Sequence, residues 1–200
     1  MDELDLLDWK RRVFALYATV RAADDPRLGW EEWYATRREL FVSHPQSPVP
    51  AGERAAYDGP LVFDYDPAWR LLADVEEAEP QRFELPSSDG ATMAFTRFGV
   101  ASVRDRDVRL ELYWLEGYGG GLFVPFADAT SGDETYGAGR YVLDTIKGAD
   151  LGVADDGRLV LDLNFAYQPS CSYDPRWTCP LAPPANRLGV AVEAGEKLEV

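Results

Sequence analysis

The sequence is poor in several residue types, and each shortage narrows what the protein can be. It has two cysteines and one histidine, so a zinc site of four ligands would have to combine both cysteines, His44 and a carboxylate. No apolar run approaches the ~20 residues of a membrane-spanning helix. The first residues, MDELDLLDWKRR, lack the apolar core of a signal peptide. These shortages predict a soluble cytoplasmic protein with no metal site and no tightly bound cofactor.

Lysine is also scarce, being present only as Lys10, Lys147 and Lys197, while 35 acidic residues outnumber 20 basic ones and give a formal net charge of −15. An anionic surface with few lysines stays hydrated in concentrated salt, where screening weakens repulsion between like charges. The composition therefore predicts a halophilic archaeal protein, the alternative being an ordinary acidic mesophilic one. The same charge opposes binding to nucleic acid and to anionic lipid.

Residues 1–42 predict a helical layer. Between residues 2 and 23, side chains recur at three- and four-residue steps, and acidic residues occupy the first turn. The recurring positions are Leu4, Leu7, Trp9, Val13, Phe14, Leu16, Tyr17, Val20 and Arg21. A second helix is expected from about residue 29 to residue 41, with buried Trp30, Trp33, Tyr34 and Leu40 and with Glu31, Glu32, Arg37 and Arg38 outside. The pair is interpreted as a layer packed on a sheet, or alternatively as a lid or dimer face.

A proline-rich connector, SHPQSPVPAGERAAYDGP (residues 43–60), separates the helices from the rest of the chain. It carries His44, the only histidine. An imidazole in this place suits either a general base or metal ligand, or a loop side chain with a hydrogen-bonded or solvated ring.

Residues 61–200 predict a β-rich body, so that the chain forms one domain. The expected strands are residues 61–66, 69–77, 81–86, 93–103, 107–116, 121–128, 140–146, 158–165 and 186–194. In residues 107–116 the alternation places Val108, Leu110, Leu112 and Trp114 on one face and Arg109, Glu111 and Tyr113 on the other, while residues 104–106 are expected at a hairpin tip. Because no helical pattern intervenes, consecutive strands should be antiparallel, in a barrel or sandwich of about eight or nine strands.

Two segments are unusually dense in polar and aromatic residues between glycines and prolines. They are TSGDETYGAGRY (residues 130–141) and LNFAYQPSCSYDPRWTCPLAPPANRL (residues 163–188). Long loops of this richness in a compact domain are usually functional or disordered, and their aromatic content argues against disorder. With the upstream HPQSPVP and DYDPAWR and the terminal AGEK, these motifs resemble domain-of-unknown-function family 1684 of uncharacterised bacterial and archaeal proteins. The resemblance covers about residue 37 to the C-terminus and implies no activity or cofactor.

Cys171 and Cys179 lie eight residues apart in the second segment. They are interpreted as buried, inert anchors of the loop, with a disulfide, a metal site and a nucleophile as alternatives. The glycines of residues 117–121 are interpreted as a turn or bulge, because a phosphate-binding loop would open a helix and carry Gly-Lys-Ser/Thr.

The candidate site residues come from both segments. If the two connections meet at one end of the barrel, Glu134 is a candidate general acid or base, and Arg140 can clamp an anionic group. The other candidate ligand-binding residues are Asp128, Ser131, Tyr136, Asn164, Tyr167, Tyr173, Asn186 and Arg187. The alternative is a structural network, in which Arg140 and Arg187 pair with Glu134 and Asp128, and the asparagines satisfy buried backbone.

Three functions therefore stay open. The favoured one is binding of an unknown small molecule at these residues. The second is a hydrolase- or isomerase-type enzyme that needs no cofactor and uses Glu134 as its acid or base. The third is a protein-interaction module that docks a partner through the aromatic loop of residues 173–177.

Overall fold

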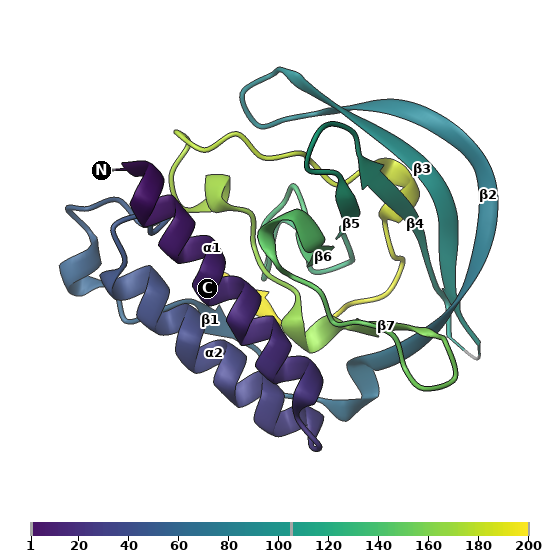
Figure 1. Ribbon diagram of the computed structural model, residues 1–200, viewed down its shortest axis with the longest axis horizontal. Coiled ribbons are helices and arrows are strands. Elements are labelled where there is room, and N and C mark those ends of the chain that lie inside the picture. Colours follow the sequence, from purple (N-terminus) through teal and green to yellow (C-terminus); the bar gives the residue numbers. More distant parts are fainter. Residues whose placement is uncertain (1, 105, 200) are drawn as a thin grey trace.

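Two N-terminal helices lie side by side along one flank of a strongly curved antiparallel sheet (Figure 1). The computed structural model describes residues 2–104 and 106–199. None of the helices in these ranges is both long and apolar enough to cross a membrane. The architecture is mainly β in an α+β arrangement, as the sequence predicts.

Helices α1 (Asp2–Ala22) and α2 (Pro26–Ser43) closely match their predicted ranges. Asp25 ends the connection between them and caps α2, since its carboxylate accepts a hydrogen bond from the backbone N–H of Arg27 at 2.9 Å. Pro26 stands in the first turn of α2, where its missing N–H costs nothing. Leu16 and Tyr17 of α1 and Trp33 of α2 enter the core of the β-sheet, so the helices form the expected packed layer.

The buried faces of the helices differ in part from the prediction. Leu4, Leu7 and Phe14 of α1 are exposed, although they share the repeat that contains Tyr17. Only the face of α1 that carries Leu16 and Tyr17 packs on the sheet, because the recurring positions spread over more than one face of the helix. Arg37 was placed outside, yet its side chain is only 13% exposed and pairs with Glu196.

The main sheet has six strands in the order β6-β5-β4-β3-β2-β7, all antiparallel. They are β2 (Arg70–Pro86), β3 (Thr92–Val103), β4 (Val108–Leu115), β5 (Gly121–Phe126), β6 (Arg140–Asp144) and β7 (Leu159–Asp162). A separate pair joins β1 (Leu61–Val62) to β8 (Glu196–Lys197). After β7 the chain returns to β6, where Tyr141 and Tyr167 exchange backbone hydrogen bonds of 2.9 Å. This contact nearly closes the sheet into a barrel.

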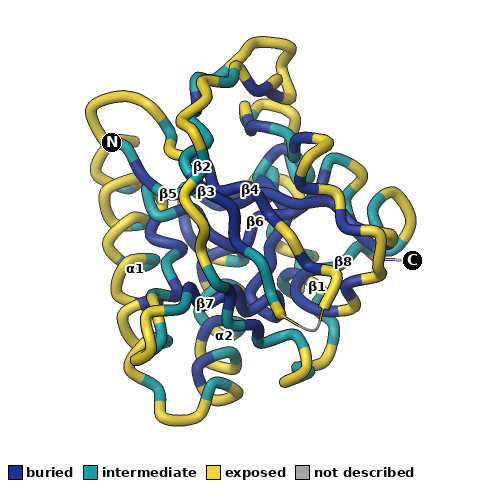
Figure 2. Tube along the Cα trace, turned by 90° about the vertical axis from the view of Figure 1, so that its right-hand side faces the viewer, coloured by how far each residue is buried: buried dark blue, intermediate teal, exposed yellow. Residues whose placement is uncertain are grey.

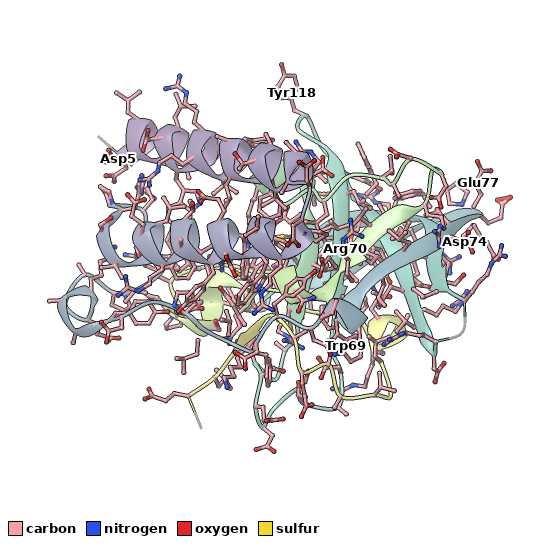
Figure 3. The ribbon with its side chains drawn as sticks, turned by 90° about the horizontal axis from the view of Figure 1, so that it is seen from below. Asp5, Trp69, Arg70, Asp74, Glu77 and Tyr118 are labelled. Atoms are coloured by element: carbon pink, nitrogen blue, oxygen red, sulfur yellow. The ribbon has the colours of Figure 1, made fainter. Side chains whose placement is uncertain are left out.

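Burial follows this curvature, with buried residues along the strands and exposed ones on the outer turns of α1 (Figure 2). Tyr118 projects from the glycine-rich turn between β4 and β5 (Figure 3), where a turn was predicted. Inside the barrel, the ring of Phe95 stacks on that of Phe123 with centroids 5.2 Å apart, and Phe123 meets Tyr141 edge to face at 4.7 Å. These aromatic contacts link β3, β5 and β6.

Several strand predictions need correction. Of the predicted strands 61–66 and 158–165, only Leu61–Val62 and Leu159–Asp162 are strand. Residues 69–77 and 81–86 form one long strand, β2, because β3 pairs with both halves across a register shift between Glu77 and Gln81. Residues 186–194 form no strand; the side chain of Arg140 bonds to the carbonyls of Val192 and Ala194 in place of a partner strand. The expected tip at residues 104–106 includes Asp105, which lies outside the described residues.

The predicted faces of β4 also fail in part, because this strand is covered on both sides. Tyr113 is buried, with its ring packed against Phe83 and Phe95 and its hydroxyl bonded to Glu111. Trp114, predicted to share a face with Leu110 and Leu112, is 47% exposed near the end of the strand, whereas those two are buried. Alternation of polar and apolar residues predicts one solvent-exposed face, but most of β4 is buried on both faces.

His44 lies at the end of α2 and is buried. Its Nδ1 accepts a hydrogen bond from the backbone N–H of Gln46 at 3.0 Å, and its Nε2 lies 3.3 Å from Asp8. The ring also packs edge-on against Trp9, with centroids 5.2 Å apart. These contacts are those of a loop histidine that joins the connector to α1.

Candidate functional site

The two dense segments lie against each other. Besides the Tyr141–Tyr167 pair, the backbone N–H of Ala182 donates to the carbonyl of Ala138 at 3.2 Å. Ala127, just before the first segment, bridges to Arg187 at the end of the second. The contact between the segments is filled by side chains that bond to one another and to backbone.

Arg140 is at the centre of this contact and is completely buried. Its Nη2 donates to the carboxylate of Asp128 at 2.8 Å and to the carbonyl of Val192 at 2.9 Å, and its Nη1 donates to the carbonyls of Ala194 and Glu196. Burial lowers the pKa of Arg140, while the Asp128 carboxylate opposes that change. The guanidinium thus fixes the C-terminal segment to β6, which favours the structural alternative for this residue.

The two asparagines hold backbone in place. Asn186 accepts from the N–H of Glu111 at 2.8 Å and donates to the carbonyls of Glu111 and Pro125 at 3.0 and 2.7 Å. Asn164 accepts from the N–H of Asp66 at 2.9 Å and donates to the Asp66 carbonyl and to Asp162 Oδ1, both at 2.8 Å. Where the chain leaves the sheet, each asparagine side chain supplies the hydrogen bonds that this backbone would otherwise receive from a paired strand.

The remaining predicted residues are more dispersed. Ser131 accepts from the N–H of Asp128, Tyr136 lies 3.8 Å from the sulfur of Cys171, and Tyr173 donates to Glu196 at 3.3 Å. The half-buried Glu134 receives a backbone hydrogen bond from Leu198, and Arg187 is exposed. The structure therefore brings the two segments together without gathering these side chains around one hollow.

Arg37 is an interaction centre that the sequence prediction missed. Its Nε and Nη2 both lie 2.7 Å from Glu196 Oε1, and its guanidinium stacks 4.5 Å from the ring centre of Phe41 and 4.8 Å from that of Tyr167. The pair connects α2 to β8. The sequence signal for the burial of Arg37 was the four-residue spacing of Trp33, Arg37 and Phe41, which puts the arginine on the buried face of α2.

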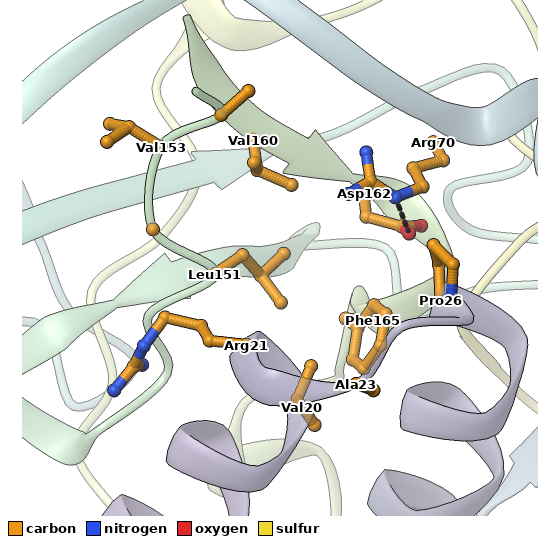
Figure 4. A pocket seen from close by; sticks show the side chains of 12 residues that line it. Val20, Arg21, Ala23, Pro26, Arg70, Leu151, Val153, Val160, Asp162 and Phe165 are labelled. Carbon is orange, nitrogen blue, oxygen red and sulfur yellow. Dashed lines mark ion pairs between the residues drawn. The ribbon is translucent and has the colours of Figure 1, made fainter. Parts of the chain in front are cut away.

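The most site-like cavity lies elsewhere, between the helices and the end of β7. It has a volume of about 210 Å³. Figure 4 shows Asp162 and Arg70 at one side of it and Arg21 at the other. The rest of the lining is mainly apolar and comprises Val20, Ala23, Pro26, Leu151, Gly152, Val153, Ala154, Val160 and Phe165. We call this cavity the Asp162 pocket.

Asp162 is 1% exposed and is held by one oxygen only. Its Oδ1 accepts from the backbone N–H and from the side chain of Asn164 at 3.1 and 2.8 Å. Its Oδ2 has no hydrogen-bond donor among the described residues, and the nearest cationic atom, Nε of Arg70, is 3.9 Å away. A buried carboxylate oxygen without a donor is unusual in a folded protein.

The electrostatic state of Asp162 reflects this environment. Burial raises its pKa from an ordinary value of 3.8 to about 6, against the opposing effects of the Asn164 hydrogen bonds and of Arg70. The carboxyl group therefore exchanges its proton close to neutral pH, which is the behaviour of acid–base and ligand-binding carboxylates.

The charges around the pocket balance. Arg70 faces Asp162, and Arg21 bonds to the carbonyl of Asp150 at 2.6 Å and lies 3.6 Å from its carboxylate. Because each cation has its own anion, the pocket carries no excess charge to attract an ion. Its free polar feature is Oδ2 of Asp162.

Sequence reasoning placed no functional residue here except Asn164, which orients Asp162. The signal available was an aspartate that interrupts the apolar run of residues 159–163 and precedes an asparagine by two positions. A charged residue at the buried end of a strand is costly unless it has a role. Arg70 had no comparable signal, because its relation to β7 depends on the pairing of β2 with β7.

A second cavity, of about 390 Å³, borders the second dense segment at Gln168, Ser172 and Tyr173. Several other residues of its lining are exposed, among them Asp58, Leu61 and Glu199. Because these residues face solvent, a ligand there would stay partly hydrated. The Asp162 pocket is the better candidate.

The comparisons with known proteins agree with the resemblance found in the sequence. The model of the family described as "Protein of unknown function (DUF1684)" matches residues 55–197. A solution NMR structure of an uncharacterised protein of Haloarcula marismortui is similar, with 34% identity and a TM-score of 0.59, over 88% of this chain and 98% of that one. Comparison with curated proteins gave no match.

Proposed function

Because the chain belongs to the DUF1684 family of proteins of unknown function, whose name carries no chemistry, we propose from the site itself that the protein binds a small neutral organic molecule in the Asp162 pocket. The observation that carries this proposal is the carboxyl group of Asp162, a residue that lines the cavity and whose buried Oδ2 lacks a donor. A ligand hydroxyl or N–H group would supply that donor.

The size and charge of the pocket narrow the ligand class. A cavity of about 150 Å³ holds a benzene molecule, so this cavity of about 210 Å³ suits a molecule modestly larger than benzene. The apolar residues of the lining favour a ligand that is largely apolar, and the balanced charges favour a neutral ligand. A hydrogen bond to a charged partner contributes about 1.5–3 kcal/mol, which is enough to select for one hydroxyl or N–H group.

The test uses p-cresol and p-xylene as probes, because they have nearly the same shape and differ in one hydroxyl group. Binding is followed by chemical-shift changes of Val20, Leu151, Val160 and Phe165, which line the pocket. We expect p-cresol to bind at least ~10-fold more tightly than p-xylene. Asp162→Asn should remove most of this preference, because it replaces a charged acceptor with a neutral amide, and hydrogen bonds to charged groups are the stronger ones.

Asp155→Asn is the matched control, since Asp155 is exposed and lies outside the pocket lining. It removes the same charge from the same side of the molecule and should leave both affinities unchanged. Equal binding of the two probes, binding of neither, or an unchanged preference in Asp162→Asn would refute the proposal.

A second candidate is acid–base catalysis on the bound molecule, with Asp162 rather than Glu134 as the proton carrier. It is favoured because burial raises the pKa of Asp162 to about 6. The roles of Glu134 and of the other predicted ligand-binding residues stay predictions. Turnover that Asp162→Asn abolishes and Glu134→Gln retains would support the Asp162 assignment.

We also propose that the protein works in the cytoplasm of a salt-adapted cell and has no nucleic-acid partner. The support is the net charge of −15 and the scarcity of lysine, together with the similarity to a protein of Haloarcula marismortui. An acidic surface repels the phosphates of nucleic acids. The salt dependence of stability, considered below, tests this proposal.

A further inference from the structure

Cys171 and Cys179 form a buried pair on the second dense segment, away from the residues of the Asp162 pocket. Both are free thiols, 9% and 2% exposed. The backbone N–H of Cys171 donates to the sulfur of Cys179 at 3.4 Å, and the two thiol groups hydrogen-bond to each other. One sulfur thus lies 3.4 Å from the backbone nitrogen of the other cysteine, so the two residues are neighbours in space, as disulfide formation requires.

The contact is held by a neighbouring element. Ser88, in the turn between β2 and β3, donates its backbone N–H to the carbonyl of Cys179 at 2.9 Å and accepts at its hydroxyl from the N–H of Cys179 at 3.1 Å. Thr178 bonds to the carboxylate of Asp89 in the same turn at 2.8 Å. The position of Cys179 is therefore fixed by the sheet, and not by the loop alone.

The two thiols are chemically unequal. The hydrogen bond from Cys179 lowers the pKa of Cys171 to about 6, against the effect of burial and with help from Ser88 and Tyr136. The same hydrogen bond raises the pKa of Cys179. The opposite directions of these two pKa shifts mark Cys171 as the thiol that ionises first and Cys179 as the one that keeps its proton.

The other titratable groups around the pair are compatible with this state. Tyr136 lies 3.8 Å from the sulfur of Cys171, and burial, followed by the charge of Cys171, raises its pKa to about 12, so it stays a donor. Burial likewise raises the pKa of Tyr141. Lys147 acts on Cys179 and partly offsets the rise in its pKa.

We propose that Cys171 and Cys179 are a peroxide-oxidisable dithiol, in which Cys171 is the attacking thiolate and Cys179 the resolving thiol. The Cys171 thiolate attacks one oxygen of hydrogen peroxide, the O–O bond breaks, and a sulfenic acid and hydroxide form. The sulfur of Cys179 then attacks the sulfur of Cys171, and the S–O bond breaks with release of a second hydroxide. The proton of Cys179 and one from solvent convert the two hydroxides to water, so peroxide is reduced and two thiols become one disulfide.

The order of these steps follows from the unequal pKa values of the two thiols. Cys179 is held protonated mainly by its hydrogen bond to the Cys171 thiolate. Once Cys171 is oxidised, that thiolate no longer exists and Cys179 can lose its proton. The resulting disulfide would close the loop of residues 171–179, which carries Tyr173, the partner of Glu196 and Phe41.

The experiment treats the fully reduced protein with one equivalent of hydrogen peroxide at pH 7, blocks remaining thiols with N-ethylmaleimide, and maps the products by mass spectrometry. We expect a peptide pair joined through Cys171 and Cys179. In Cys179→Ser, oxidation should stop at a sulfenic acid on residue 171 that dimedone traps. In Cys171→Ser, the oxidation of Cys179 should be at least ~10-fold slower, because burial still raises the pKa of this thiol without its partner and a protonated thiol is a poor nucleophile.

The wild-type rate as a function of pH decides the question even if a variant fails to fold. The oxidation rate should be half-maximal near pH 6 and level above pH 7, whereas the same chain unfolded in urea should follow an ordinary thiol, with a midpoint near pH ~8.5. Retention of two alkylatable thiols after peroxide, equal rates in wild type and Cys171→Ser, or a native midpoint near that of the unfolded chain would overturn the proposal.

Discussion

At the scale of single residues, the protein keeps a carboxyl group in a place that is unfavourable for its charge. Burial raises the pKa of Asp162 to about 6, so the folded chain binds this proton more tightly than the unfolded chain does. The contribution of Asp162 to stability is therefore fully present below about pH 4 and is lost as the pH rises through about 6. Above that pH the loss amounts to about 3 kcal/mol.

Asp162→Asn is therefore expected to stabilise the protein at pH 8. The amide keeps the oxygen that accepts from Asn164 and cannot ionise, so the free energy of unfolding should rise by about 2 kcal/mol, with part of the gain offset by the lost attraction of Arg70. The gain should vanish near pH 4. Urea titrations at both pH values measure it, with Asp155→Asn as the exposed control. A variant that is less stable at pH 8 would show that the carboxylate is paired better than its geometry indicates.

Arg37 and Glu196 differ from Asp162, because each of these two buried charges is paired with the other. Glu196 is completely buried and accepts from Arg37, Gln168 and Tyr173. Arg37→Met should cost about 3–5 kcal/mol of stability, since it leaves this carboxylate without its cation. Glu196→Gln in the same chain should recover part of that loss. Strict additivity of the two changes in urea titrations would mean that the pair is not coupled.

At the scale of the elements, side chains make hydrogen bonds to backbone groups that neighbouring strands would make in a more regular sheet. Asn186 joins β4 and β5 through the backbone of Glu111 and Pro125. Asn186→Ala should destabilise by about 3 kcal/mol, because it leaves buried backbone groups without partners. Arg187→Ala, a change at the exposed neighbour, should stay within about 0.5 kcal/mol. Equal effects of the two changes would contradict the structural role of Asn186.

Hydrogen bonds from distant side chains to backbone, in place of strand pairing, limit what the sequence could predict. Local periodicity was sufficient for α1, α2, β3 and β5 because their signals lie within the element itself. It failed for residues 186–194, whose apolar alternation suggested a strand while the backbone bonds to the side chain of Arg140. No local rule reports a partner that lies some fifty residues away.

The candidate site was harder to predict than the fold for the same reason. The dense segments attract attention by composition, and they do meet, but their polar side chains mostly bond to backbone and to residues outside the two segments. The Asp162 pocket joins α1, β2 and β7 with the loop around Leu151, and none of these segments is conspicuous alone. Its defining feature is a missing donor, which only three-dimensional contacts can reveal.

At the scale of the whole molecule, the dominant fact is the net charge of −15. Some acidic residues have cationic partners, such as Asp74 with Arg104 at 2.8 Å. Others crowd the exposed outer surface of β2, where Glu76, Glu77 and Glu79 are close in sequence and Glu77 projects outward in Figure 3. Salt weakens both the attraction in exposed pairs and the repulsion among like charges. With nearly twice as many acidic as basic residues, relief of repulsion should be the larger effect.

The midpoint of urea unfolding should therefore rise by about 1 M between low salt and 2 M KCl. A variant with Glu76, Glu77 and Glu79 changed to glutamine reduces the net charge from −15 to −12 (−15 + 3) and should respond less to KCl while being more stable in low salt. An equal concentration of sucrose separates charge screening from general exclusion of cosolute, which would affect both proteins alike. A midpoint that does not move with KCl, or that moves equally in the two proteins, would mean that the acidic surface is not an adaptation of stability to salt.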